Sequence, residues 1–194
     1  MTNTWRLFIA IELTPELRQW ITIQRAQLES RMLPDTVRWV QPDGIHLTLK
    51  FLGETHAGRI DEICRAMDLA TAVFPPFSLA VSDLGCFPNI ARPRVVWAGL
   101  QTSPDLMDLQ LRLEDELATT GFPREQRAFS PHLTLARVRD GITIDELHQI
   151  GAAVKRSEPV EEIEMKVKEV CLFRSTLLPA GAEYMRLHQV SLSG

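Results

Sequence analysis

The chain has 194 residues, of which 45% are hydrophobic and 24% charged, and its formal net charge is −4 at pH 7. These values suit a globular protein with one domain or two tightly joined lobes. The negative balance argues against a protein that coats long nucleic acids, and no apolar run reaches the roughly 20 residues needed to cross a bilayer. The beginning of the chain lacks the basic region and cleavage site of a signal peptide, so we expect a cytoplasmic protein.

Hydrophobic periodicity and turn signals predict alternating strands and helices. In chain order we expect a strand over 5–13, a helix over 15–32, strands over 37–40 and 45–53, a helix over 57–73, strands over 77–87 and 94–100, a helix over 104–121, a strand over 131–138, a helix over 142–155, and strands over 161–173 and 183–192. Each half of the chain then holds two helices. This pattern indicates an α+β fold over 1–194, with a pseudo-symmetric arrangement of two lobes in a single domain.

The tetrapeptide HLTL occurs twice, beginning at His46 and at His132. Alternate side chains of a strand share a face, so each histidine lies on the same face as the following threonine, Thr48 or Thr134, while the leucines point into a core. Imidazole exchanges protons near neutral pH, and a hydroxyl donates to an oxyanion without adding charge. Two facing pairs therefore suit in-line displacement at phosphorus. A purely structural repeat, with threonine pairs that stabilise a sheet face, is the alternative.

With these motifs the chain resembles the 2H phosphoesterase superfamily, which is defined by two HxTx motifs. Within it, the chain is similar to the RNA 2′,3′-cyclic phosphodiesterases, also called the bacterial and archaeal 2′–5′ RNA ligases. The resemblance rests on RLFIAIEL at 6–13, HLTLKFLGE at 46–54, VVWAGL at 95–100, FSPHLTLAR at 129–137 and FRSTLLPAGAEY at 173–184. It implies a bilobal 2H phosphoesterase fold in which two antiparallel-rich sheets line a central cleft, with the helices outside.

The resemblance also implies an activity, the hydrolysis of 2′,3′-cyclic phosphate ends of RNA to 2′-phosphomonoesters without a metal or other cofactor. By this similarity, His46 is the proton donor to the leaving 3′ oxygen and His132 is the proton acceptor that activates water. Thr48 and Thr134 hold the non-bridging phosphate oxygens. The site is nearly symmetric, so the sequence itself leaves open which histidine is acid and which is base. The expected partners are RNA ends or small oligonucleotides, and nothing in the sequence suggests an obligate dimer.

Two arginines are candidate substrate contacts, because arginine is suited to binding phosphate. Arg137 follows His132 by five residues, so a regular strand would turn its side chain to the opposite face unless a bulge or the strand end returns it. Arg94 lies in the loop just before the predicted strand over 94–100. For both, a solvated surface charge is the alternative.

Two further residues complete the candidate substrate site. Lys50 has the same alternation parity as His46, so we expect it to face the cleft and add positive charge. Phe87 is a candidate for stacking on an unpaired base. Phe51 could do the same, but its apolar strand favours packing in the core.

Other functions remain open at this stage. The same site could ligate RNA through a 2′–5′ bond or cleave 2′–5′ oligonucleotides. A non-catalytic protein that binds RNA ends could also have both histidine–threonine pairs. A metallohydrolase would need carboxylates or further histidines near the motifs. The remaining histidines, His56, His148 and His188, share no metal-ligand spacing.

Overall fold

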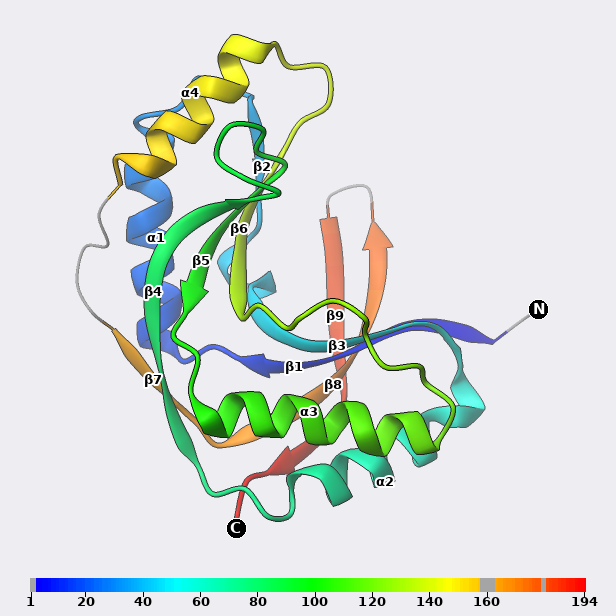
Figure 1. Ribbon diagram of the computed structural model, residues 1–194. Helices are drawn as coiled ribbons and strands as arrows, with labels where there is room; N and C mark the ends of the chain where they lie inside the picture. Colours follow the sequence, from blue (N-terminus) through cyan, green and yellow to red (C-terminus); the bar gives the residue numbers. More distant parts are fainter. Residues whose placement is uncertain (1–2, 158–162, 179–180) are drawn as a thin grey trace.

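The computed structural model describes residues 3–157, 163–178 and 181–194, which form four α-helices and nine strands (Figure 1). In chain order these are β1 (Thr4–Glu12), α1 (Pro15–Glu29), β2 (Val37–Trp39), β3 (His46–His56), α2 (Ile60–Thr71), β4 (Phe77–Phe87), β5 (Val95–Leu100), α3 (Pro104–Thr119), β6 (His132–Val138), α4 (Ile144–Lys155), β7 (Glu164–Val167), β8 (Glu169–Leu178) and β9 (Gly181–Ser191).

α1 and α3 begin at the expected residues, whereas α2 and α4 begin at Ile60 and Ile144 rather than at the expected 57 and 142. The Thr14 hydroxyl accepts from the backbone N–H of Leu17 at the start of α1, with proline as the next residue. Thr143 and Glu146 form a reciprocal capping box at the start of α4. α1 ends at Glu29, three residues before the expected 32, because the chain after it tightens into turns whose N–H groups bond three residues back.

The strands form two antiparallel sheets, which confirms the predicted α+β class. One sheet has four strands in the order β3-β1-β8-β9, and the other has five in the order β2-β6-β5-β4-β7. The expected long strand over 161–173 is wrong as a single element. It divides at Lys168, with β7 in the five-stranded sheet and β8 in the four-stranded sheet. The expected start at 161–162 lies outside the described residues.

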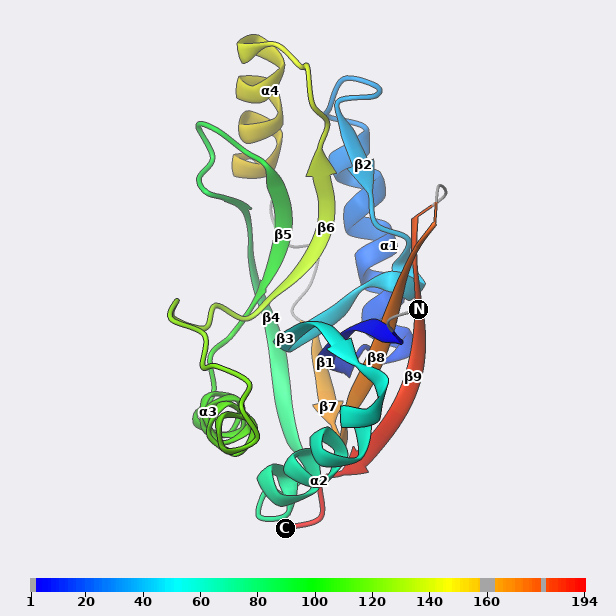
Figure 2. The same ribbon diagram turned by 90° about the vertical axis from the view of Figure 1, so that its right-hand side faces the viewer.

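The helices cover the outer surfaces of the sheets. α2 packs on α3, which contacts β3, while α4 contacts β4 and α1 contacts β7. Figure 2 shows α2 and α3 together at one end of the molecule and α4 at the other. Burial of one leucine stabilises the fold by about 1.5–3 kcal/mol, so the apolar stripe of α3 is a major contribution. Its fully buried members are Leu106, Leu109, Leu113 and Leu117.

The leucines of both HLTL motifs are also in this core, as strand alternation predicts. Leu47, Leu49, Leu133 and Leu135 are each at most 3% exposed. These leucines hold one face of each motif strand against the core, so the histidines and threonines lie on the other face, away from the core. In the described part of the chain, no helix is long and apolar enough to cross a membrane.

Candidate active site

The structure brings the four motif residues together in one cleft of about 490 Å³ between the two sheets. His46 and Thr48 of β3 line one side, and His132 and Thr134 of β6 line the other. All four are half-buried, so the walls hold them while a ligand can still reach them. A second hollow of about 530 Å³, lined by residues of α4 and by Arg31, contains none of the motif residues.

A bulge follows the threonine of the first motif. Thr48 and Lys50 pair with consecutive residues of β1, which leaves Leu49 without a partner in the ladder. One extra residue reverses the alternation of the strand. Lys50 therefore turns away from the cleft into the interior, and Phe51 turns into the cleft instead.

Both expectations for these two residues are therefore wrong. Lys50 is 6% exposed, and its ammonium lies 2.5 Å from Glu114 Oε2 and 2.9 Å from the Pro123 carbonyl oxygen. Phe51 is 68% exposed and lines the cleft. Lys50 is thus a structural residue and adds no positive charge to the site, whereas Phe51 offers an open aromatic face.

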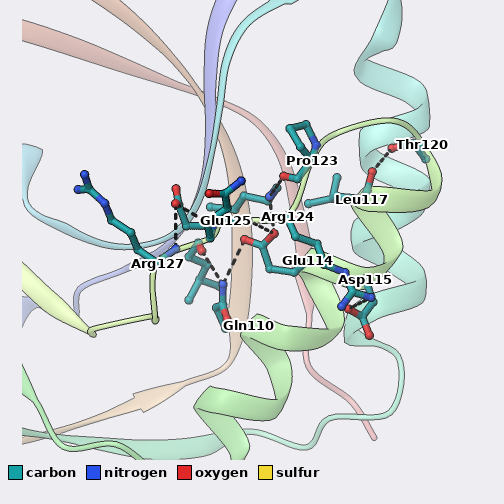
Figure 3. A network of polar contacts seen from close by, with 12 residues as sticks. Gln110, Glu114, Asp115, Leu117, Thr120, Pro123, Arg124, Glu125 and Arg127 are labelled. Carbon is teal, nitrogen blue, oxygen red and sulfur yellow. Dashed lines mark hydrogen bonds and ion pairs between the residues drawn. The ribbon is translucent and has the colours of Figure 1, made fainter.

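Glu114 joins the first motif strand to the loop that precedes the second. Its Oε2 accepts from Lys50 and from the backbone N–H of Glu125, and its Oε1 accepts from the Gln110 side chain at 3.3 Å (Figure 3). The pair is buried, so its charges are screened little by solvent. This network fixes the course of residues 123–125 on the way to His132.

The second motif has a matching bulge. Thr134 and Ala136 pair with consecutive residues of β5, which leaves Leu135 unpaired. The alternation again reverses, so Ala136 is buried and Arg137 lines the cleft. The cleft position of Arg137 thus depends on a bulge, one of the two exceptions that the sequence left open.

His46 lies in an aromatic enclosure. Its ring stacks on that of Phe8 with 4.6 Å between ring centroids. The Tyr184 ring lies nearly perpendicular to it, with 5.1 Å between centroids. The pKa of His46 is lowered to about 4, chiefly by burial in these surroundings; a hydrogen bond with the Gly44 backbone acts in the opposite direction, and the positive charge of Arg18 adds to the lowering. In the ligand-free protein His46 is therefore neutral at pH 7.

His132 is oriented in the same way as His46. Its Nδ1 lies 2.7 Å from the Ser130 carbonyl oxygen. The Phe87 ring is nearly perpendicular to the imidazole, with 4.9 Å between ring centroids. In both motifs the ring thus bonds to the backbone two residues earlier, Gly44 or Ser130. Donation from Nδ1 leaves Nε2 of neutral His132 with a free lone pair, as a general base requires.

Two arginines supply the positive charge of the cleft. Arg137 and Arg6 are both exposed and line it, and among the described residues neither guanidinium has a hydrogen-bond or ion-pair partner. No acidic residue is among the described residues of the lining. Arg6 is not among the candidates predicted from the sequence, although its alternation with Phe8 on β1 was the available signal.

Of the remaining candidates, Phe87 lines the cleft and Arg94 does not. The Arg94 side chain is exposed at the start of β5. Its backbone N–H donates to the Phe87 carbonyl oxygen at 2.7 Å, and its own carbonyl accepts from Val138 at 2.9 Å. Arg94 therefore joins β4 and β6 through its backbone, and the expectation of an Arg94 contact in the cleft finds no support.

One group in the described chain has potential metal ligands close together, and it adjoins the first motif, because its member Glu12 is the cross-strand partner of His46. It consists of Glu12, Glu169 and Cys171, whose ligand atoms lie within 4.8 Å of one another. Arg186 Nη1 lies 2.9 Å from Glu12 and 3.9 Å from Glu169. The arginine thus already balances these carboxylates.

Comparison with known proteins identifies this arrangement. The family model described as LigT-like phosphoesterase matches residues 11–97 and 100–184, and each matched segment contains one HLTL motif. This chain belongs to the LigT-like phosphoesterase family. The RNA 2′,3′-cyclic phosphodiesterase of Methanothermobacter thermautotrophicus is 34% identical over 92% of this chain and 94% of the relative. That of Escherichia coli K12 is 36% identical over 74% and 78%.

Solved structures have the same fold. Escherichia coli LigT, crystallised with 3′-AMP, superimposes with a TM-score of 0.79 at 30% identity and covers 98% of this chain and 99% of its own. The TT0787 protein of Thermus thermophilus gives a TM-score of 0.81 at 27% identity, over 96% and 97%. The bilobal fold expected from the resemblance is thereby confirmed.

Proposed function

We propose that this LigT-like phosphoesterase hydrolyses the 2′,3′-cyclic phosphate at RNA ends to a 2′-phosphomonoester. The observation that carries the proposal is that two histidine–threonine pairs lie in one cleft. Among the described residues that line this cleft, the only charged side chains besides the histidines are arginines. The names of the relatives support the same reaction. We further propose that the enzyme acts as a monomer and needs neither a metal nor a nucleotide cofactor.

In the proposed reaction, His132 Nε2 takes a proton from a water molecule as its oxygen attacks phosphorus. The bond from phosphorus to the 3′ oxygen breaks, and His46 delivers a proton to that oxygen. The hydroxyls of Thr48 and Thr134 donate to the non-bridging oxygens, on which negative charge increases in the transition state. Arg137 offsets this charge from the β6 side.

The low pKa of His46 places a condition on this assignment. At a pKa of about 4 the ligand-free imidazole holds no proton at neutral pH, and a donor needs one. The bound phosphate supplies the missing stabilisation, because an adjacent anion raises the pKa of an imidazole. The substrate itself therefore brings His46 into the donor state.

The test is an assay of the purified protein with RNA that ends in a 2′,3′-cyclic phosphate, with EDTA present and ATP absent. We expect a 2′-phosphate product, and we expect His46→Ala and His132→Ala each to lower kcat by about 10²–10⁴-fold. Circular dichroism on each variant checks that the fold is retained. A 3′-phosphate product, or a histidine variant with the wild-type rate, would overturn the proposed mechanism.

A second activity is favoured by the matching backbone bonds of the two histidines. Both rings are held in the same way, so acid and base can exchange, as the reverse reaction requires. With a 5′-hydroxyl RNA in place of water, the same site would form a 2′–5′ bond. Addition of that RNA to the hydrolysis assay measures the ratio of ligation to hydrolysis directly.

A further inference from the structure

We propose that Arg6 and Ser175 form a subsite for the phosphodiester on the 5′ side of the terminal nucleotide, so that the enzyme distinguishes oligonucleotide ends from cyclic mononucleotides. This inference rests on the proposed function and specifies its substrate. Arg6 of β1 and Ser175 of β8 are direct partners in the sheet, and both line the cleft.

Both side chains have unused hydrogen-bonding groups. The Arg6 guanidinium is exposed, and Ser175 is half-buried. In the described part of the chain, neither side chain has a hydrogen-bond partner, unlike Arg18 or Arg186, which are paired with carboxylates. An arginine fork beside a hydroxyl is a chemically suitable pair for the oxygens of a phosphodiester.

Arg6 lies on the same wall of the cleft as His46, beyond the ring on which His46 stacks. Phe8 stacks on His46 with 4.6 Å between ring centroids. Arg6 lies two residues from Phe8 on the same face of β1, or roughly 7 Å at the rise of a β-strand. Phe8 thus separates Arg6 from His46, and we infer that the long arginine side chain reaches back past Phe8 to the phosphate next to the reacting one.

Apolar side chains line this end of the cleft, where the nucleoside between the two phosphates would lie. Phe51 and Leu177 are each 68% exposed and line the cleft. Leu177 lies on β8 and Tyr184 on β9, two strands that run side by side in Figure 1, and both residues line the cleft. Cations alternating with open aromatic and apolar surface are typical of sites that bind single-stranded nucleic acid.

One carboxylate lies close to the proposed subsite. Glu54 of β3 is the cross-strand partner of Arg6 on the side opposite Ser175. It is exposed, it is not part of the cleft lining, and it forms no ion pair with Arg6 within 4 Å. The guanidinium is therefore free to bind a phosphate, and Glu54→Gln should not weaken that binding.

The test compares adenosine 2′,3′-cyclic phosphate with the dinucleotide ApA that ends in a 2′,3′-cyclic phosphate. We expect the wild-type kcat/KM to be higher for the dinucleotide. Arg6→Ala should remove about tenfold or more of this advantage, the value of one charged hydrogen bond, and should slow the mononucleotide much less. Ser175→Ala should have the same selectivity with a smaller loss, and Arg6→Lys should restore part of it.

Arg94→Ala is the matched control, because Arg94 is an exposed arginine outside the cleft, and it should change neither rate. If Arg6→Ala slows both substrates equally, Arg6 acts at the reaction centre and the subsite is wrong. If it slows neither, Arg6 is a solvated charge and the subsite is again wrong.

A binding measurement separates the inference from the proposed function. The probes are the 2′-phosphates of adenosine and of ApA, which need no turnover. Arg6→Ala should raise the Kd of the dinucleotide alone, and it should reduce the salt dependence of that Kd by about one ionic contact. If the wild type hydrolyses no cyclic phosphate but shows this selective loss, the proposed function fails and the subsite stands. Equal Kd changes for both probes would overturn the subsite whatever the activity.

Discussion

Phe51 and Arg137 occupy equivalent positions in the two halves of the molecule, each five residues after a motif histidine and each facing the cleft. The same irregularity causes both, because a bulge at the fourth residue of each HLTL motif reverses the alternation of its strand. The two halves thus share a β-bulge at the same position of the motif and differ in the side chain that follows it into the cleft. One wall offers an aromatic ring and the other a guanidinium.

Phe51→Ala should weaken substrate binding with little effect on the chemical step. Stacking of a base on an aromatic side chain is worth about 1–3 kcal/mol, so we expect KM to rise by about 5–150-fold while kcat stays within a few fold. Phe51→Tyr keeps the ring and should keep KM. Steady-state kinetics on an RNA with a cyclic phosphate end measures both values, and an unchanged KM in Phe51→Ala would show that Phe51 contacts no substrate.

Replacement of either motif threonine by alanine should slow turnover without preventing it. Loss of one oxyanion donor typically costs about 10²–10³ in kcat, and we expect this for Thr48→Ala and Thr134→Ala. The serine variants keep the hydroxyl and should retain most of the rate. A serine variant as slow as the alanine variant would mean that the methyl group, and not the hydroxyl, is what the site requires.

NMR titration of the ligand-free protein should show His46 with a pKa of about 4, well below the ordinary value, because burial disfavours its charged form. Arg18→Gln should raise this pKa, since it removes a positive charge that opposes protonation. Saturation with a nucleoside 2′-phosphate should raise it much further. Titration near the ordinary value of 6.5 without ligand would contradict the enclosure by Phe8 and Tyr184.

The same shift makes the fold sensitive to acid. The unfolded chain protonates this imidazole near pH 6.5, whereas the folded protein does so only near pH 4, so the unfolded state gains an extra proton between these values. The stability that neutral His46 provides is complete above about pH 6.5 and is lost as the pH falls towards 4. We expect His46→Gln to reduce this loss by up to about 3 kcal/mol, measured by urea unfolding at pH 7 and pH 4.5.

Lys50→Met should destabilise the protein by about 3–5 kcal/mol, because it leaves the buried Glu114 carboxylate without its counter-charge. The double variant Lys50→Met, Glu114→Gln removes both charges and should recover much of the loss. Urea unfolding at pH 7 measures each variant. If Lys50→Met leaves the free energy of unfolding unchanged, the ion pair does not stabilise the fold and water can replace it.

The motifs could be predicted from the sequence because strand alternation is a local property. The apolar partners of His46, Thr48, His132 and Thr134 determine which way these side chains face, and the structure has all four leucines buried. The chain order of helices was predictable for the same reason, since caps such as Thr14 are local signals.

The errors arise where one strand depends on another. Lys50 and Phe51 exchange faces because Leu49 has no partner on β1, and nothing in LKF itself marks that bulge. Lys168 likewise separates two strands that continue one apolar pattern but pair with different sheets. Glu114, the partner of Lys50, is 64 residues away along the chain, so this ion pair has no local signal.

The division at Lys168 affects how substrates can enter. One residue joins a strand of one sheet to a strand of the other, and its carbonyl oxygen also accepts from the Leu192 N–H at 2.8 Å. A hinge needs a few residues that can absorb large changes in backbone angles. This connection has a single residue between two strands. At this connection the two sheets are therefore joined closely, and we expect an RNA end to enter the cleft without a large separation of the sheets here.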